Sequence, residues 1–206
     1  MKSALYAAVA LLGLLAIPVQ AQTYYQGFED VSPQFFQSPV LGSSSDGSTM
    51  DITTEVAHNG RHAARLSYQF TKRGYIDLAL AQAPIVVSHG DDIRLAMWIY
   101  GSGQNDFPSG GSLNLLDAGG ETFQYHIGTP LADALDGTGW HIVKAEVTLS
   151  KFNGHWGGKN TGVIKLPMRF LGFGLDHWPD AAAGGEVYFD DVLIKGSNSS
   201  SENNLK

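Results

Sequence analysis

The chain has 206 residues and a formal net charge of −7 at pH 7, from 13 basic and 20 acidic side chains. This balance argues against nucleic acid or an anionic membrane as partner, since both reward clustered Lys and Arg, whereas 11% aromatic residues and 25 glycines suit a neutral ligand held by stacking and hydrogen bonds. Cysteine is absent, which excludes a disulfide framework and a thiol nucleophile.

The first segment, residues 1–21, is typical of a secretory signal peptide. Lys2 precedes an apolar stretch that ends in Val19-Gln20-Ala21, a small-x-small pattern for cleavage after Ala21. A membrane anchor is the alternative, but the apolar run is short and Pro18 interrupts its end. We therefore expect a secreted protein, extracellular or periplasmic.

Residues 22–196 alternate short strand patterns with turn residues, which is typical of a single antiparallel all-β sandwich or barrel. The polar, low-complexity residues 197–206 predict a flexible tail or linker. Ten strands are expected, in chain order, at 23–29, 50–58, 62–70, 74–81, 93–101, 112–118, 122–128, 140–149, 169–178 and 186–194.

Alternation within these strands assigns their side chains to faces. If the strands share one sheet, its outer face presents aromatic rings to stack on a pyranose and polar groups to reach its hydroxyls. Two alternatives stay open: Trp98 and Tyr100 fill a second layer, and Trp156 and Trp178 are either rim aromatics or structural plugs. The expected ligand-binding residues are Tyr75, Asp77, Arg94, Trp98, Tyr100, Gln124, His126, Asp176 and Trp178.

Five stretches, in the right order and spacing, resemble carbohydrate-binding modules of the β-jelly-roll, galactose-binding-like superfamily. The resemblance implies a two-sheet antiparallel β-sandwich (jelly roll) whose concave sheet often carries the ligand. It also implies a monomer that binds polysaccharide or oligosaccharide without catalysis and assists a polysaccharide-degrading enzyme, which could be a tethered catalytic domain. The stretches are GFED (27–30), HNGRHAARLSYQF (58–70), AMWIYGSG (96–103), GTGWHIVKAEV (137–147) and GGEVYFDDVLI (184–194).

The same resemblance implies a structural calcium ion near the first strand, tied to the last. Its ligands would be the carboxylates of Glu29 and Asp190 and backbone carbonyls near Asn59 and Arg61, with Asp30 as a replacement for Glu29. Carboxylates and carbonyls are the oxygen ligands that calcium takes.

Catalysis by the paired acids Asp190 and Asp191 is disfavoured. Neighbours on a strand point to opposite faces, whereas a hydrolytic pair must face one bond from both sides. The Asp91–Asp92 pair is more simply a solvated turn and stays unassigned.

Two other function classes remain as alternatives. Some jelly rolls are polysaccharide lyases or hydrolases, and Arg94, Tyr100, Gln124 and His126 could imitate such a set. A lyase cleft for an acidic polymer gathers several cations, and Arg94 alone is expected on this face. A ligandless structural or adhesion domain would be favoured if the loop at 101–111 covered the concave face.

Overall fold

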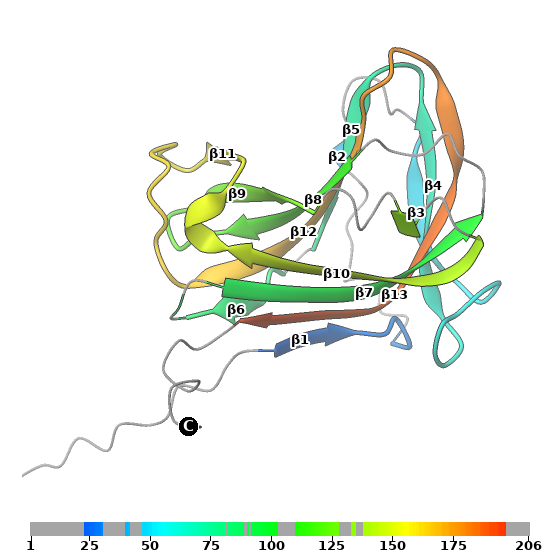
Figure 1. The fold of residues 1–206 in the computed structure, drawn as a ribbon, viewed down its shortest axis with the longest axis horizontal. Coiled ribbons are helices and arrows are strands. Elements are labelled where there is room, and N and C mark those ends of the chain that lie inside the picture. The colour runs from blue at the N-terminus through cyan, green and yellow to red at the C-terminus, as the bar shows by residue number, and fades with distance from the viewer. Residues whose placement is uncertain are drawn as a thin grey trace, which may run out of the picture.

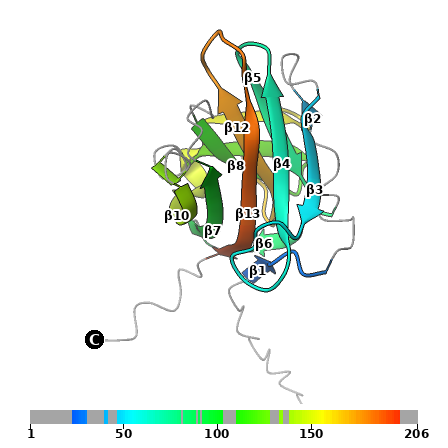
Figure 2. The same ribbon diagram turned by 90° about the vertical axis from the view of Figure 1, so that its right-hand side faces the viewer.

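Two antiparallel sheets face each other across one hydrophobic core (Figures 1 and 2). The computed structural model describes residues 23–30, 40–41, 47–80, 82–88, 90, 92–102, 110–127, 133–134 and 138–196. The predicted signal peptide and tail, Asp91, and most of the loop at 101–111 lie outside these residues. Over the described residues, no helix is long and apolar enough to cross a bilayer.

Within the described residues, six strands form sheet A. They are β1 (Thr23–Gln26), β3 (Thr49–Thr53), β4 (Ala63–Phe70), β7 (Asp92–Ser102), β10 (Thr138–Thr148) and β13 (Ala183–Gly196). Their order is β10-β7-β13-β4-β3, and β1 pairs with the C-terminal part of β13. β13 bends along its length, pairing first with β4 and then with β7, as Figure 1 shows.

Seven strands in the same part of the chain form sheet B. They are β2 (Val40–Leu41), β5 (Gly74–Ala79), β6 (Ile85–Val87), β8 (Gly110–Leu116), β9 (Glu121–His126), β11 (Gly154–Gly157) and β12 (Met168–His177). Their order is β11-β9-β8-β12-β5-β2, and β6 pairs with the start of β12. A short 3-10 helix, η1 (Leu149–Lys151), follows β10.

The fold class predicted from the sequence is confirmed, and each of the ten expected strands is present. The sequence pattern did not predict β2, β6 and β11. These strands have two to four residues, too few for a period of two to stand out.

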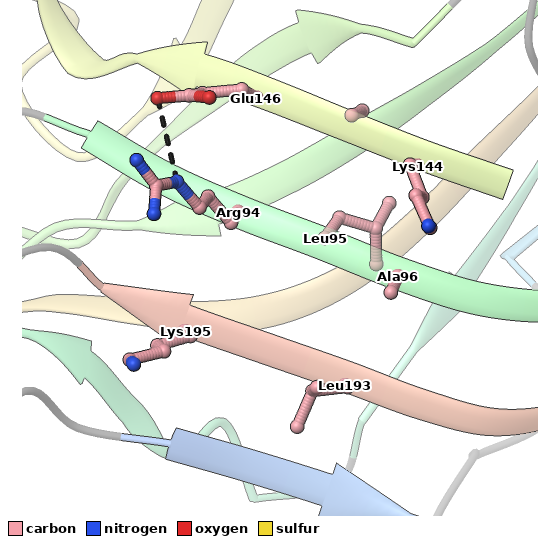
Figure 3. A pocket seen from close by; sticks show the side chains of 8 residues that line it. Arg94, Leu95, Ala96, Lys144, Glu146, Leu193 and Lys195 are labelled. Carbon is pink, nitrogen blue, oxygen red and sulfur yellow. Dashed lines mark ion pairs between the residues drawn. The ribbon is translucent and has the colours of Figure 1, made fainter.

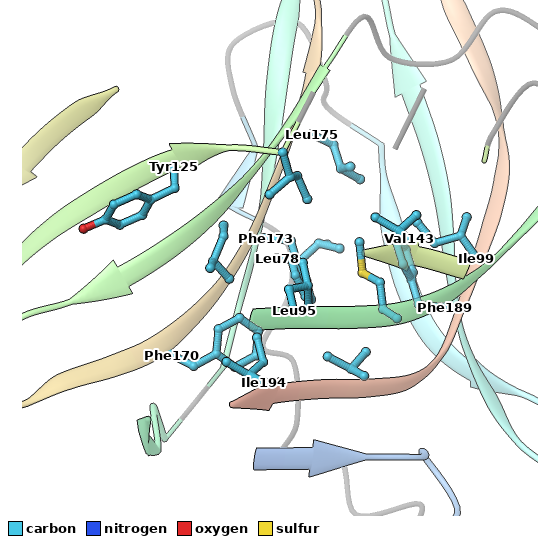
Figure 4. Packing of buried hydrophobic residues seen from close by; sticks show 14 of the residues in the cluster. Leu78, Leu95, Ile99, Tyr125, Val143, Phe170, Phe173, Leu175, Phe189 and Ile194 are labelled. Carbon is cyan, nitrogen blue, oxygen red and sulfur yellow. The ribbon is translucent and has the colours of Figure 1, made fainter. Parts of the chain in front are cut away.

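Alternating apolar side chains from both sheets fill the core (Figure 4). Ile93, Met97 and Ile99 of β7 are at most 1% exposed, as are Phe123 and Tyr125 of β9. Burying a side chain of this size contributes about 1.5–3 kcal/mol. Because the core fixes the inward residues, the residues between them lie on the two outer faces of the sandwich.

Two bulges interrupt this alternation. In β12 the register shifts between Phe170 and Gly172. Gly172 has φ of 152°, and a Cβ at that position would lie 1.7 Å from the carbonyl oxygen of Leu78, so no side chain fits there. In β13 the register shifts after Asp190, and Asp191 takes a left-handed φ of 48°. The second bulge changes where the paired acids point.

Candidate functional site

The structure divides the predicted ligand-binding residues between the two sheets. The expectation that they share one sheet is wrong because β7 pairs with β10 and β13 in sheet A. Alternation reports which side of a strand a residue is on, but strand pairing decides which sheet the strand joins. Tyr75, Asp77, Gln124, His126 and Asp176 belong to sheet B, Trp178 directly follows its strand β12, and Arg94, Trp98 and Tyr100 belong to sheet A.

A row of hydrogen-bonded side chains crosses the outer face of sheet B. Asn114 Nδ2 donates to Asp77 Oδ1 at 3.1 Å, and Ser112 Oγ donates to Asn114 Oδ1 at 3.3 Å. Gln124 Nε2 donates to Ser112 Oγ at 3.0 Å. These four residues, from β5, β8 and β9, form the polar row. Asn114 and Ser112 were not predicted, although their alternation with Leu113 and Leu115 could have indicated them.

A glycine lets the polar row pass over the strand between β8 and β5. Gly174 of β12 is the cross-strand partner of both Ser112 and Asp77. A Cβ at Gly174 would lie 2.4 Å from Ser112 Oγ and 3.0 Å from Asp77 Oδ1. The missing side chain therefore leaves space in which β5 and β8 can exchange a hydrogen bond.

The polar row is largely removed from water. Ser112 and Asn114 are 0% and 3% exposed, and both are hydrogen-bonded, as buried polar groups require. Burial raises the pKa of Asp77 to about 6; the hydrogen bond from Asn114 opposes the rise, and the charge of Asp176 adds to it. Burial also raises the pKa of Asp176, while His126 lowers it. Two carboxyl groups with raised pKa values thus lie on this face.

Exposed aromatic side chains flank the polar row. Trp178 is 53% exposed, and its ring lies over Gly110 of β8, where a Cβ would be 3.1 Å away. Tyr75, 46% exposed, is the cross-strand partner of Asp176. Tyr75 thus lies on β5, toward one edge of the face, and Trp178 lies at the end of the central strand β12.

A third aromatic ring lies at the opposite edge of sheet B. Trp156 of β11 is 40% exposed and pairs with Thr122 of β9. Directly paired residues point to the same face, and Thr122 shares its face with Gln124. Four strand spacings separate β11 from β5, about 19 Å. The outer face of sheet B therefore has aromatic rings near both edges and polar groups between them, an arrangement that fits an extended glycan.

The sheet A members of the predicted set lie in a layer of packed rings. The ring of Trp98 stacks on His58 with centroids 3.8 Å apart and planes at 16°. Tyr100 packs edge-on against Trp140 at 5.5 Å and Tyr188 at 5.8 Å. This is the second-layer alternative left open by the sequence. A sugar-binding role for Trp98 and Tyr100 stays a prediction, and one face of Trp98 is already covered.

The residues proposed to imitate a lyase are likewise divided. Arg94 and Tyr100 lie on sheet A, and Gln124 and His126 lie on sheet B. Arg94 also forms an ion pair with Glu146 at 3.5 Å. The lyase set is therefore not assembled on one face.

The first of the predicted calcium-binding carboxylates accepts backbone N–H groups. Glu29 Oε1 accepts from Arg61 N at 2.7 Å and from His62 N at 2.9 Å. These amides lower the pKa of Glu29. The residues around Arg61 thus present amide donors to Glu29, whereas a cation requires oxygen lone pairs.

The second carboxylate, Asp190, is 0% exposed and is held in the same way. Its Oδ2 accepts from His58 N at 2.8 Å and Asn59 N at 3.1 Å, and its Oδ1 accepts from Asp191 N at 2.7 Å. In the described part of the chain, no three His, Cys, Asp or Glu side chains are grouped to hold a metal. Backbone N–H groups hold Glu29 Oε1 and both oxygens of Asp190, and the calcium ion stays a prediction from the resemblance alone. We call the two carboxylates and residues 58–62 the acid–turn clasp.

Asp190 and Asp191 both contact His58, which corrects the expectation that they face apart. Asp191 Oδ2 lies 2.7 Å from His58 Nδ1, and Asp191 Oδ1 accepts a hydrogen bond from the Tyr25 hydroxyl of β1. The left-handed φ of Asp191 in the bulge turns both side chains toward the same turn. Their contacts tie the first and last strands to residues 58–59, so the pair is structural.

Comparison with solved structures identifies the architecture. The chain is 14% identical to CtCBM11 as determined in solution, covering 89% of this chain and 100% of that one with a TM-score of 0.54. It is 13% identical to the family 11 carbohydrate-binding module of the cellulosomal cellulase Lic26A-Cel5E of Clostridium thermocellum, covering 84% and 95% with a TM-score of 0.52. The fold is that of a carbohydrate-binding module.

Identities this low establish the fold alone. The chain also spans 59% of a structure from work on the promiscuous specificity of carbohydrate-binding modules of the β-sandwich superfamily, with 14% identity over 81% of this chain and a TM-score of 0.49. No protein-family model matches the sequence, and no curated protein matches it either.

Proposed function

We propose that this protein binds a neutral polysaccharide or oligosaccharide, without cleaving it, on the outer face of sheet B. The observation that carries the proposal is the polar row between Trp156 on the edge strand β11 and Tyr75 on β5, with Trp178 at the end of the central strand β12. Trp178 and Trp156 offer flat surfaces for the C–H faces of sugar rings. Asp77 and Gln124, both partly exposed, offer a carboxylate and an amide to hydroxyl groups.

A pre-formed face reduces the entropic cost of binding. Gln124 and Asp77 are held by hydrogen bonds within the polar row, so they lose little freedom when a ligand arrives. In this proposal the protein holds a polymer close to a secreted polysaccharide-degrading enzyme, either tethered through residues 197–206 or acting separately.

Affinity electrophoresis against a panel of neutral polysaccharides tests the proposal. Replacing Trp178 or Trp156 by Ala removes a stacking surface and weakens binding about 10-fold or more. Trp98→Ala, on the opposite sheet, is the matched control and leaves affinity unchanged once circular dichroism shows that the variant is folded. If binding is lost with Trp98→Ala and kept by both other variants, the ligand lies on sheet A and the proposal fails.

A glycoside hydrolase is the second candidate, because Asp77 and Asp176 on neighbouring strands both have raised pKa values. The same mixtures are assayed for new reducing ends and for unsaturated products. No release is expected with any polymer that is retarded. Release that disappears in Asp77→Asn or Asp176→Asn would make the protein an enzyme.

A further inference from the structure

A hollow lies on the outer face of sheet A, away from the polar row. It spans β10, β7 and β13 and has a volume of about 490 Å³. The side chains around it are shown in Figure 3. Besides Leu95 and Ala145, they are Arg94, Ala96, Lys144, Glu146, Leu193 and Lys195, and we call the site that these six surround the cationic hollow.

Strand register explains the shape of the hollow. Ala96 of β7 is the cross-strand partner of Lys144 on β10 and of Leu193 on β13. Its methyl group leaves a depression between these two longer side chains. Arg94 is flanked in the same way by Glu146 and Lys195, so charged groups close one end.

The hollow is positively charged in a protein of net charge −7. Three of its side chains are cations and one is an acid. Glu146 is paired with Arg94 at 3.5 Å, while Lys144 and Lys195 have no ion pair with any described residue. Two ammonium groups are therefore available on either side of an apolar floor.

The floor is apolar and open to solvent. Leu193 is 38% exposed. Beside the hollow, Ile142 lies next to Lys144 on the same face of β10 and is 42% exposed. Tyr25 of β1 pairs with Leu193 and is 55% exposed, which extends this surface toward the sheet edge. A ligand that fills the hollow needs an apolar face and at least one anionic group.

We propose that the cationic hollow binds a carboxylated sugar, a uronate unit of an acidic glycan. A uronate places a carboxylate on the rim of a pyranose whose C–H face is apolar, which matches the lysines and the floor. The volume lies within the usual range for small-ligand sites, whereas a protein partner requires about 800 Å² of surface. The outer face of sheet B carries Asp77 and Asp176 instead and would repel a uronate, so the two faces select different glycans, one neutral and one acidic. This site does not depend on the site proposed for sheet B.

Calorimetric titration with tetragalacturonate tests the proposal, with neutral galactotetraose as the matched probe. The parent protein binds the uronate and not the neutral oligomer at this site, and added salt weakens binding because exposed charges are screened. Lys144→Gln combined with Lys195→Gln weakens binding at least about 10-fold, since two charged hydrogen bonds are lost. Lys159→Gln, an exposed cation following β11, is the control and binds as the parent does.

Two further measurements separate the alternatives. Trp178→Ala keeps uronate binding, and the double lysine variant keeps binding of neutral polysaccharide on sheet B, so each site can fail alone. Absence of uronate binding in the parent overturns the proposal. Loss of uronate binding in Trp178→Ala, with uronate binding kept by the double lysine variant, also overturns the proposal. An affinity for polyglutamate equal to that for tetragalacturonate also overturns the proposal. The hollow would then bind anions without selecting a sugar, as a docking surface for an acidic protein would.

Discussion

Replacing Asp77 by Asn removes a charge from the polar row and keeps the hydrogen bond that the side chain accepts. Asn114 Nδ2 donates to Asp77 Oδ1 at 3.1 Å, and an Asn oxygen accepts in the same place. Burial raises the pKa of Asp77 to about 6, so the folded protein disfavours the ionised form. The unfolded chain ionises Asp77 at its ordinary pKa of 3.8.

The sign and size of the effect follow from this difference. Asp77 makes its full contribution to the free energy of unfolding below about pH 3.8, where it is protonated in both states. This contribution is lost as the pH rises through about 6, because the unfolded chain ionises Asp77 more readily than the folded protein does. At about 1.4 kcal/mol per pH unit the full loss is about 3 kcal/mol. Because Asp77 is partly exposed, we take about 2 kcal/mol as the working value. The Asn variant has no such loss and is more stable than the parent at neutral pH.

Urea unfolding of parent and variant from pH 4 to pH 7.5 measures the difference. The variant gains little at the acid end, and its advantage grows to about 2 kcal/mol above pH 6. At pH 7.5 this corresponds to a melting temperature about 4–8 °C higher for a domain of this size. Other titrating groups cancel in the difference, and Asp180→Asn, at an exposed position, is the control with a flat difference curve. A flat curve for Asp77→Asn, or a less stable variant at pH 7.5, would refute the reasoning.

Three further predictions concern the backbone and the acid–turn clasp. Gly172→Ala prevents folding or costs more than about 3 kcal/mol, because its Cβ meets the Leu78 carbonyl oxygen at 1.7 Å; Gly120→Ala, with φ of 76° and open space, costs only about 1 kcal/mol in urea unfolding. Asp190→Asn places an amide group against a backbone N–H donor, and because burial raises the pKa of Asp190, removing its charge offsets part of that cost; the free energy of unfolding falls by about 1–2 kcal/mol, and an unchanged urea midpoint would contradict the clasp. Chelation with EDTA leaves the melting temperature unchanged, because N–H groups already hold Glu29 Oε1 and both oxygens of Asp190; a fall reversed by calcium would establish the metal site instead.

The strands and their faces could be predicted because both depend on residues close together in the sequence. Ile93 of β7 and Phe123 of β9 alternate with polar neighbours, and the structure buries both. Turn residues between the strands mark where each one ends. These local patterns account for the fold class and for six of the nine predicted ligand-binding residues, which lie on sheet B or directly after its strand β12.

The contents of the candidate site depended on contacts between distant residues. Asp77 meets Asn114 only because β12, about 60 residues further along from Asn114, places Gly174 between their strands. Trp156 joins the face only because the short β11 pairs with β9. Neither contact leaves a periodic signal in the sequence.

By itself, the sequence determined an all-β chain and separated core from outward residues wherever the strands run without a bulge, since side-chain direction alternates along a regular strand. Only the tertiary structure decided that β7 joins sheet A, which separates Trp98 and Arg94 from the polar row. It also decided that the bulge at Asp191 brings both paired acids to His58. Strand pairing and bulges depend on contacts between distant parts of the chain. Each pairing must satisfy the backbone hydrogen bonds of both strands and also bury an apolar face, and no single strand carries enough information for both.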